Sequence, residues 1–182
     1  MSRFTASLLV TPLDDGKSWV IVTDDFTYDV GEEGSGDSVH VPRGMLTDFA
    51  SVPRAIWWFA APWGKHGHAA VLHDAGYYLQ LRSRPDYDRI FLEAMEVLEV
   101  GKLKRTLMYR AVRWFGGAAW SANAERNRTK PGWKIVDPAT LGVLATGEAD
   151  SMSPDSAPVT HDRANAPSVQ EVREAVDAAR SK

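Results

Sequence analysis

The chain has 182 residues, 44% of them hydrophobic and 25% charged, so it can bury one ordinary core, and we expect one compact domain with extensions. Its formal net charge of −3 argues against a protein that is basic overall, and nucleic-acid binding is not favoured. The absence of Cys excludes a disulfide framework, a thiolate zinc cluster and a Cys nucleophile.

The first fifty residues have the pattern of short strands. Residues 6–10, 18–23 and 26–30 are rich in β-branched and aromatic side chains, and the turn sequences DDG and GEEGSGD separate them. Residues 38–42 alternate with a period of two and stop at Pro42. We therefore expect an antiparallel β-meander over about residues 5–42.

From Pro53 the apolar spacing changes to the 3.6-residue period of helices. Ser83 is the predicted N-cap of one helix, with Pro85 in its first turn. The last of these helices is expected to end at Gly116 and Gly117. The predicted helices are residues 53–62, 65–80, 84–101 and 102–116. The last of them places Leu103, Leu107, Ala111 and Trp114 on one face.

The predicted fold class is therefore α+β, with the N-terminal meander packed against a bundle of three to four helices at about 53–117, all within a domain of residues 1–128. Residues 129–167 read as an extended, disordered linker, because they offer little to bury. A short helix at 168–182 has a thin apolar face that would dock on a partner.

One long stretch carries a family resemblance. The sequence VPRGMLTDFASVPRAIWWFAAPWGKHGHAAVLHDAGYY, followed by DYDRIFLEAM and KRTLMYRAVRWFG, resembles a family of phage and prophage proteins known as domain of unknown function 1353. The resemblance covers roughly residues 38–120 and implies no established activity. It implies a phage or prophage origin. Since we find no signal peptide and no apolar stretch near the ~20 residues of a membrane span, we expect a soluble protein of the host cytoplasm or the virion.

Two shorter pieces carry a second resemblance. HDAGY is similar to the His-Asp-x-x-Tyr helix motif of secreted phospholipases A2, and YDRIF is similar to the helix that carries their second catalytic Asp. The resemblance implies that His73 is a general base, Asp74 a ligand of a divalent cation such as Ca²⁺, Asp88 the residue that orients His73, and Tyr77 or Tyr78 a support. The chain departs from those enzymes in having no Cys and no Gly-rich calcium loop.

Spacing along the chain also points to a His73–Asp88 pair. The two residues are equally far from a turn near Gln80 and Leu81, so an antiparallel pair of helices would place them at the same level. Asp88 lies on the side of its helix that carries Phe91, and an unpaired carboxylate there would be costly. A hydrogen bond between the two fixes the imidazole tautomer and raises its basicity, as general-base chemistry requires.

Two alternatives use the same residues. In the first, Asp88 pairs with Arg82, Arg89 or Arg105 and His73 is a core histidine. In the second, His66 or His68 joins the His-Asp pair in a divalent metal centre similar to that of HD-type phosphohydrolases, although the close spacing of these histidines makes such a centre cramped.

The sequence TDFASVPR, residues 47–54, places Asp48 and Ser51 before the helix expected at Pro53. Ser51 has no Gly-x-Ser-x-Gly surroundings, so both residues read better as helix caps than as nucleophilic machinery. Asp48 would face His73 if this corner packs over the helical hairpin. The predicted catalytic residues are His73, Asp88 and Asp74, and the predicted binding residues are Asp48, Ser51, Tyr77 and Arg89.

Two parts of the sequence have the composition of surfaces that bind a partner. Trp57, Trp58 and Trp63 are dense enough to leave an exposed apolar patch for a lipid or a protein neighbour. Residues 101–128 hold seven Lys or Arg against one Glu, which is either a phosphate-contacting patch or a solvated helix face.

Two functions from different classes follow. The first is a phage-encoded hydrolase of ester or phosphoester bonds in lipid or envelope material, used in envelope interaction or lysis, with His73, Asp88 and Asp74 as its machinery. The second is a non-catalytic virion protein of the tail or capsid, which contacts other phage proteins through its Trp-rich corner or its C-terminal tail.

Overall fold

The computed structural model describes residues 3–13, 18–24, 26–47 and 66–146, and it confirms the predicted fold class of antiparallel strands packed against helices. The strands are β1 (Val10–Pro12), β2 (Trp19–Ile21), β3 (Phe26–Asp29), β4 (Ser38–Val41) and β5 (Leu46–Thr47). The helices are α2 (Gly67–Leu79), α3 (Arg84–Val97), α4 (Lys102–Thr129) and α5 (Pro138–Thr146). The predicted helix at 53–62 and the predicted terminal helix at 168–182 lie outside the described residues.

The strands form two small antiparallel sheets rather than one meander. In the first, β2 lies between β1 and β5, with Thr11 opposite Val20 and Trp19 opposite Thr47. In the second, β3 pairs with β4 as a hairpin. The meander order is broken at β2, which takes β5 as its second neighbour instead of β3. The very short β5 gave no strand pattern that sequence reasoning could detect.

The segment after α4 folds back onto the first sheet. Met45 forms an antiparallel bridge with Ile135, the Leu46 amide donates to the Lys134 carbonyl at 2.8 Å, and the Val136 amide donates to the Gly44 carbonyl at 2.9 Å. Val136 then packs with Val20 and Leu141 in a small apolar cluster. Residues 134–146 therefore differ from the extended linker expected from residue 129, because Ile135, Val136 and Leu141 give them something to bury.

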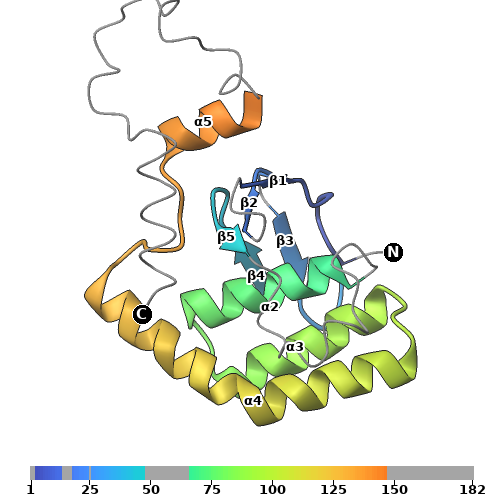
Figure 1. Ribbon diagram of the computed structural model, residues 1–182. Coiled ribbons are helices and arrows are strands. Elements are labelled where there is room, and N and C mark those ends of the chain that lie inside the picture. Colours follow the sequence, from blue (N-terminus) through green and yellow to red (C-terminus); the bar gives the residue numbers. More distant parts are fainter. Residues whose placement is uncertain (1–2, 14–17, 25, 48–65, 147–182) are drawn as a thin grey trace, which may run out of the picture.

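Helix α2 lies between the strands and the α3–α4 pair, and it contacts β4, α3 and α4 (Figure 1). Nearly all of its side chains are therefore buried, including those of His73 and Asp74. The helix ends at Gln80, whose φ of 52° is left-handed and whose amide donates to the Gly76 carbonyl. Among the described residues, no helix is long and apolar enough to cross a bilayer.

Helix α3 begins where the sequence predicts. Ser83 has extended backbone angles, its side chain accepts from the Asp86 amide, and proline occupies the first turn. This is the arrangement expected of a Ser cap, which satisfies one of the free amides at a helix N-terminus. The Tyr28 hydroxyl and the Gly31 amide both donate to Glu93, at 2.9 Å each, and tie the β3–β4 hairpin to α3.

Helix α4 does not end at Gly116 and Gly117 but continues to Thr129. Gly116 is a packing position, because a Cβ there would overlap the hydroxyl of Tyr77 on α2. Gly76 has the same role on α2, where a Cβ would overlap the Tyr87 ring. Both glycines bring a tyrosine close to a helix backbone, so the absence of a side chain serves close packing rather than termination.

Candidate functional site

The central feature of the site is the side chain of Asp88, which is fully buried on α3. Its Oδ1 lies 3.0 Å from His73 Nε2 and accepts a hydrogen bond from the Tyr77 hydroxyl at 2.8 Å. Its Oδ2 accepts from Arg113 Nη1 at 3.0 Å and from Arg84 Nη1 at 3.3 Å. One carboxylate therefore gathers four side chains from α2, α3 and α4. The predicted hydrogen bond between His73 and Asp88 is confirmed.

Helix geometry explains how these groups meet. His73 and Tyr77 are four residues apart and share one face of α2, and Arg84 and Asp88 are four residues apart and share one face of α3. The α2–α3 turn then sets the two faces against each other. Arg113 comes from the middle of α4, where Gly116, three residues on, lets that helix approach Tyr77.

The surroundings of Asp88 keep it ionised. Burial by itself would raise the pKa of this carboxyl, but the hydrogen bonds from His73, Tyr77 and Arg113 outweigh burial and hold the pKa below its ordinary value. Burial, reinforced by the bond to Asp88, raises the pKa of the Tyr77 hydroxyl. The bond to Asp88 also raises the pKa of the Arg113 guanidinium. Tyr77 is thus a neutral donor and Arg113 a permanent cation beside a carboxylate.

The tautomer of His73 follows from this ionisation state. A carboxylate is acceptor only, so Nε2 must carry a hydrogen and donate it to Asp88. In the neutral ring Nδ1 then holds the lone pair, and no hydrogen bond from the described residues reaches it. The imidazole packs against the rings of Tyr77 and Phe91, with centroids 4.2 and 4.8 Å away. The ring is therefore fixed in orientation with one basic nitrogen directed away from Asp88.

Asp74 belongs to a second polar contact on another side of α2. Consecutive positions on a helix differ by about 100°, so His73 faces α3 while Asp74 faces the strands. The Thr47 hydroxyl, at the end of β5, donates to Asp74 Oδ2 at 2.6 Å, and both side chains are buried. Asp74 is thus buried and hydrogen-bonded to Thr47, the last residue that the structure describes before residue 66.

The other predicted site residues have mixed outcomes. Of the two tyrosines, it is Tyr77 that contacts Asp88, whereas the Tyr78 ring packs edge-on against Trp133. Arg89 is not brought to the cluster: it is exposed and pairs with Asp86 on the outside of α3. Asp48 and Ser51 lie outside the described residues.

Sequence reasoning missed both arginines that pair with Asp88. The three it named pair elsewhere, Arg82 with Asp37, Arg89 with Asp86 and Arg105 with Glu96. Arg84 could have been found from its i,i+4 spacing to Asp88, which is the usual spacing of ion pairs on a helix. Arg113 carried no local signal, because it reaches Asp88 from a different helix.

The residues described in the structure include no group of three or more His, Asp or Glu side chains that could hold a metal ion. His66 Nδ1 lies 3.3 Å from the Lys104 ammonium, and His68 Nε2 accepts from the Leu8 amide at 3.4 Å, and neither of these contacts involves His73 or Asp74. The Thr47 hydroxyl is one oxygen beside Asp74, whereas Ca²⁺ takes six to eight oxygen ligands. Calcium binding at Asp74 stays a prediction.

A comparison with known families gives one match. The family model described as a protein of unknown function (DUF1353) matches residues 20–112, which is 93 of the 182 residues. The chain belongs to this family. The DUF1353 match contains His73, Asp74, Tyr77 and Asp88 and stops one residue before Arg113. No curated protein and no solved structure matches the chain significantly.

Proposed function

We propose that this DUF1353 protein is a small hydrolase of ester or phosphoester bonds in which His73 is the general base. The observation that carries the proposal is the buried contact of His73 Nε2 with Asp88 Oδ1 at 3.0 Å, supported by the Tyr77 hydroxyl on the same oxygen. This arrangement orients the ring, fixes the tautomer and stabilises the imidazolium that forms during the reaction.

In the proposed reaction, His73 Nδ1 takes a proton from a water molecule. The water oxygen forms a bond to the carbonyl carbon or phosphorus of the substrate, and the bond to the leaving oxygen breaks. The imidazolium then returns the proton to that oxygen, so that His73 ends neutral. Asp74, held by Thr47, would bind a cation or position the substrate. The substrate class is lipid or other envelope material of a phage or prophage host.

A second function is favoured by a different observation. Asp88 also accepts from Arg84 and Arg113, and both it and His73 are almost inaccessible to solvent. A buried carboxylate that joins three helices through four donors is what a structural ion-pair cluster requires. The second candidate is therefore a non-catalytic virion or assembly protein in which this cluster fixes the helices.

One experiment separates the two functions. The full chain is assayed, with Ca²⁺ and with chelator, on nitrophenyl esters, a nitrophenyl phosphodiester and phospholipid vesicles. For a hydrolase we expect turnover that falls by about 10²-fold or more in His73→Ala, the usual contribution of a general base. His68→Gln is the control, because this histidine contacts the Leu8 amide and not Asp88.

Turnover that survives in His73→Ala would refute the proposed base. No turnover by wild type on the whole panel, together with a lower melting temperature of His73→Ala, would favour the structural function instead.

A further inference from the structure

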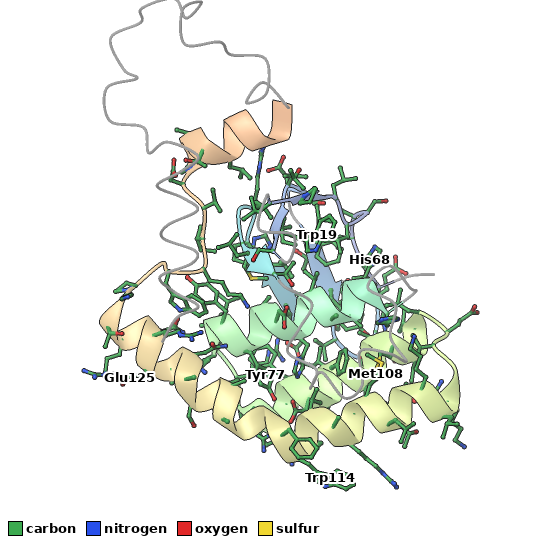
Figure 2. The ribbon with its side chains drawn as sticks, in the orientation of Figure 1. Trp19, His68, Tyr77, Met108, Trp114 and Glu125 are labelled. Atoms are coloured by element: carbon green, nitrogen blue, oxygen red, sulfur yellow. The ribbon has the colours of Figure 1, made fainter. Side chains whose placement is uncertain are left out.

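The outward face of α4 is apolar although it is exposed. Its largest exposed side chains are Leu103 (76%), Leu107 (44%), Trp114 (72%) and Phe115 (63%). Figure 2 shows Trp114 on the side of α4 turned away from α2. Leu103, Leu107 and Trp114 follow the i, i+4, i+11 spacing of one helix face, so they form a continuous stripe and not scattered exceptions.

The charged side chains beside this stripe on α4 are all basic. Between residues 101 and 124 the chain has five Lys or Arg and no Asp or Glu, although its overall charge is −3. Arg105 and Arg113 are engaged by Glu96 and Asp88. Lys102 and Arg110 are exposed, and neither forms an ion pair with any residue that the structure describes. Arg110 stands on the helix face between Leu107 and Trp114, so cationic and apolar groups share one surface.

The same surface of α4 contains a groove. Leu103, Leu107, Trp114 and Phe115, with Met108 and Ala111 beneath them, line a groove of about 350 Å³. A groove of this volume with apolar walls admits a short length of hydrocarbon. The exposed indole of Trp114 has the amphipathic character that favours the boundary between lipid headgroups and acyl chains.

We propose that the face formed by Leu103, Leu107, Arg110, Trp114 and Phe115, together with Lys102, binds the surface of an anionic lipid bilayer. A helix with Leu, Trp and Phe on one side and only Lys and Arg beside them has the composition of helices that lie in the membrane interface. The apolar side chains enter the headgroup region, and Lys102 and Arg110 contact the phosphates. This inference is independent of the proposed hydrolysis, since it concerns binding alone.

The positive charge of this face favours an anionic bilayer as its binding partner over a second copy of the chain. Two such faces packed on each other would bring Lys102 and Arg110 of both copies together without any acidic residue of α4 between 101 and 124 to offset them. A docked protein would need acidic groups at fixed positions matched to these two cations. An anionic headgroup layer supplies negative charge at every position along the stripe.

Cosedimentation of the full chain with vesicles tests the proposal. We expect binding to vesicles that contain phosphatidylglycerol, weaker binding to phosphatidylcholine alone, and weakening by salt, because the Debye length shortens. Leu103→Gln should weaken partitioning about tenfold through lost apolar burial, and Arg110→Gln about fivefold, the contribution of one basic residue at a membrane surface.

Leu9→Gln is the matched control, because Leu9 is 60% exposed and directly precedes β1, a strand that lies across the molecule from α4 (Figure 1). All of these positions are exposed, and equal melting temperatures would show that the variants fold alike. Equal vesicle binding by Leu103→Gln and Leu9→Gln would overturn the proposal, as would binding indifferent to phosphatidylglycerol. A dimer in solution that Leu103→Gln dissociates would assign the face to a second copy and overturn it too.

Discussion

Replacement of Asp88 by Asn is the most direct test of the polar cluster. The amide keeps the shape of the side chain, and its oxygen still accepts from His73 and Tyr77. Its NH₂ group, however, replaces Oδ2 and turns two donor hydrogens towards Arg84 and Arg113, which both lose their countercharge. Arg84 keeps the carbonyls of Val112 and Arg113 as acceptors, whereas Arg113 loses the acceptor that it had in Asp88.

The expected cost follows from these contacts. Breaking a buried ion pair by removing one partner costs about 3–5 kcal/mol. The arginine side chains are 23% and 34% exposed, so water partly solvates them and reduces that cost. We therefore expect Asp88→Asn to lower the free energy of unfolding by about 2–4 kcal/mol. For a chain of this size that is a fall in melting temperature of about 5–15 °C.

Asp86→Asn is the matched control for thermal and urea unfolding. Asp86 lies two residues away on α3, has a side chain that is 38% exposed, and pairs with Ser83 and Arg89 at the surface, where such contacts contribute less than about 1 kcal/mol. If the two variants unfold with the same free energy, Asp88 does not hold the three helices together, and the argument from its four donors is wrong.

Two further outcomes are expected. The first concerns pH: the pKa of Asp88 is lowered in the folded state, so its stabilising contribution is complete above the unfolded-state pKa of about 3.9. That contribution is lost as pH falls through the lower folded-state pKa. The difference in unfolding free energy between wild type and Asp88→Asn should therefore narrow below about pH 4. A gap that stays constant down to pH 2 would contradict this. Gly76→Ala should destabilise by about 1–3 kcal/mol, because its Cβ meets the Tyr87 ring, whereas Gly117→Ala, with nothing near its Cβ, should be neutral or stabilising in the same melts.

The elements that could be predicted from the sequence are those determined locally. The Ser83 cap and the turn near Gln80 fix the relative level of α2 and α3, and they therefore fix the meeting of His73 with Asp88. Tyr77 follows because it stands one helical turn after His73. The motif similar to that of phospholipases A2 named the same His73–Asp88 pair and left Tyr77 or Tyr78 as its support, and the structure places Tyr77 on Asp88.

The features that could not be predicted depend on contacts between distant residues. In α4 both faces are apolar enough to be core, and the sequence does not say which one packs. The structure buries Met108, Ala111 and Val112, whereas Leu103 and Trp114, which the spacing places on the same face as Ala111, are exposed. Of the four apolar residues that the spacing places on one face of α4, Ala111 is buried and the other three are exposed.

Glycine is ambiguous in the same way. Gly116 and Gly117 read as a helix end because glycine favours the left-handed conformation there. Glycine also permits close approach of another chain segment, and at Gly116 that second use applies. The choice depends on Tyr77, thirty-nine residues earlier in the sequence, and no local pattern shows it.

The pairing of residues 134–136 with β5 determines how far the chain can be truncated from its C-terminal side. These residues cover hydrogen-bonding groups of β5 and the preceding turn, from Gly44 to Leu46. A strand edge left uncovered is a template for pairing with other chains and for aggregation. The DUF1353 match ends at residue 112, well before this cover. A fragment that ends at residue 112 would therefore expose an aggregation-prone strand edge. The shortest fragment that keeps this edge covered must extend at least to Leu141, whose side chain packs in the cluster with Val20.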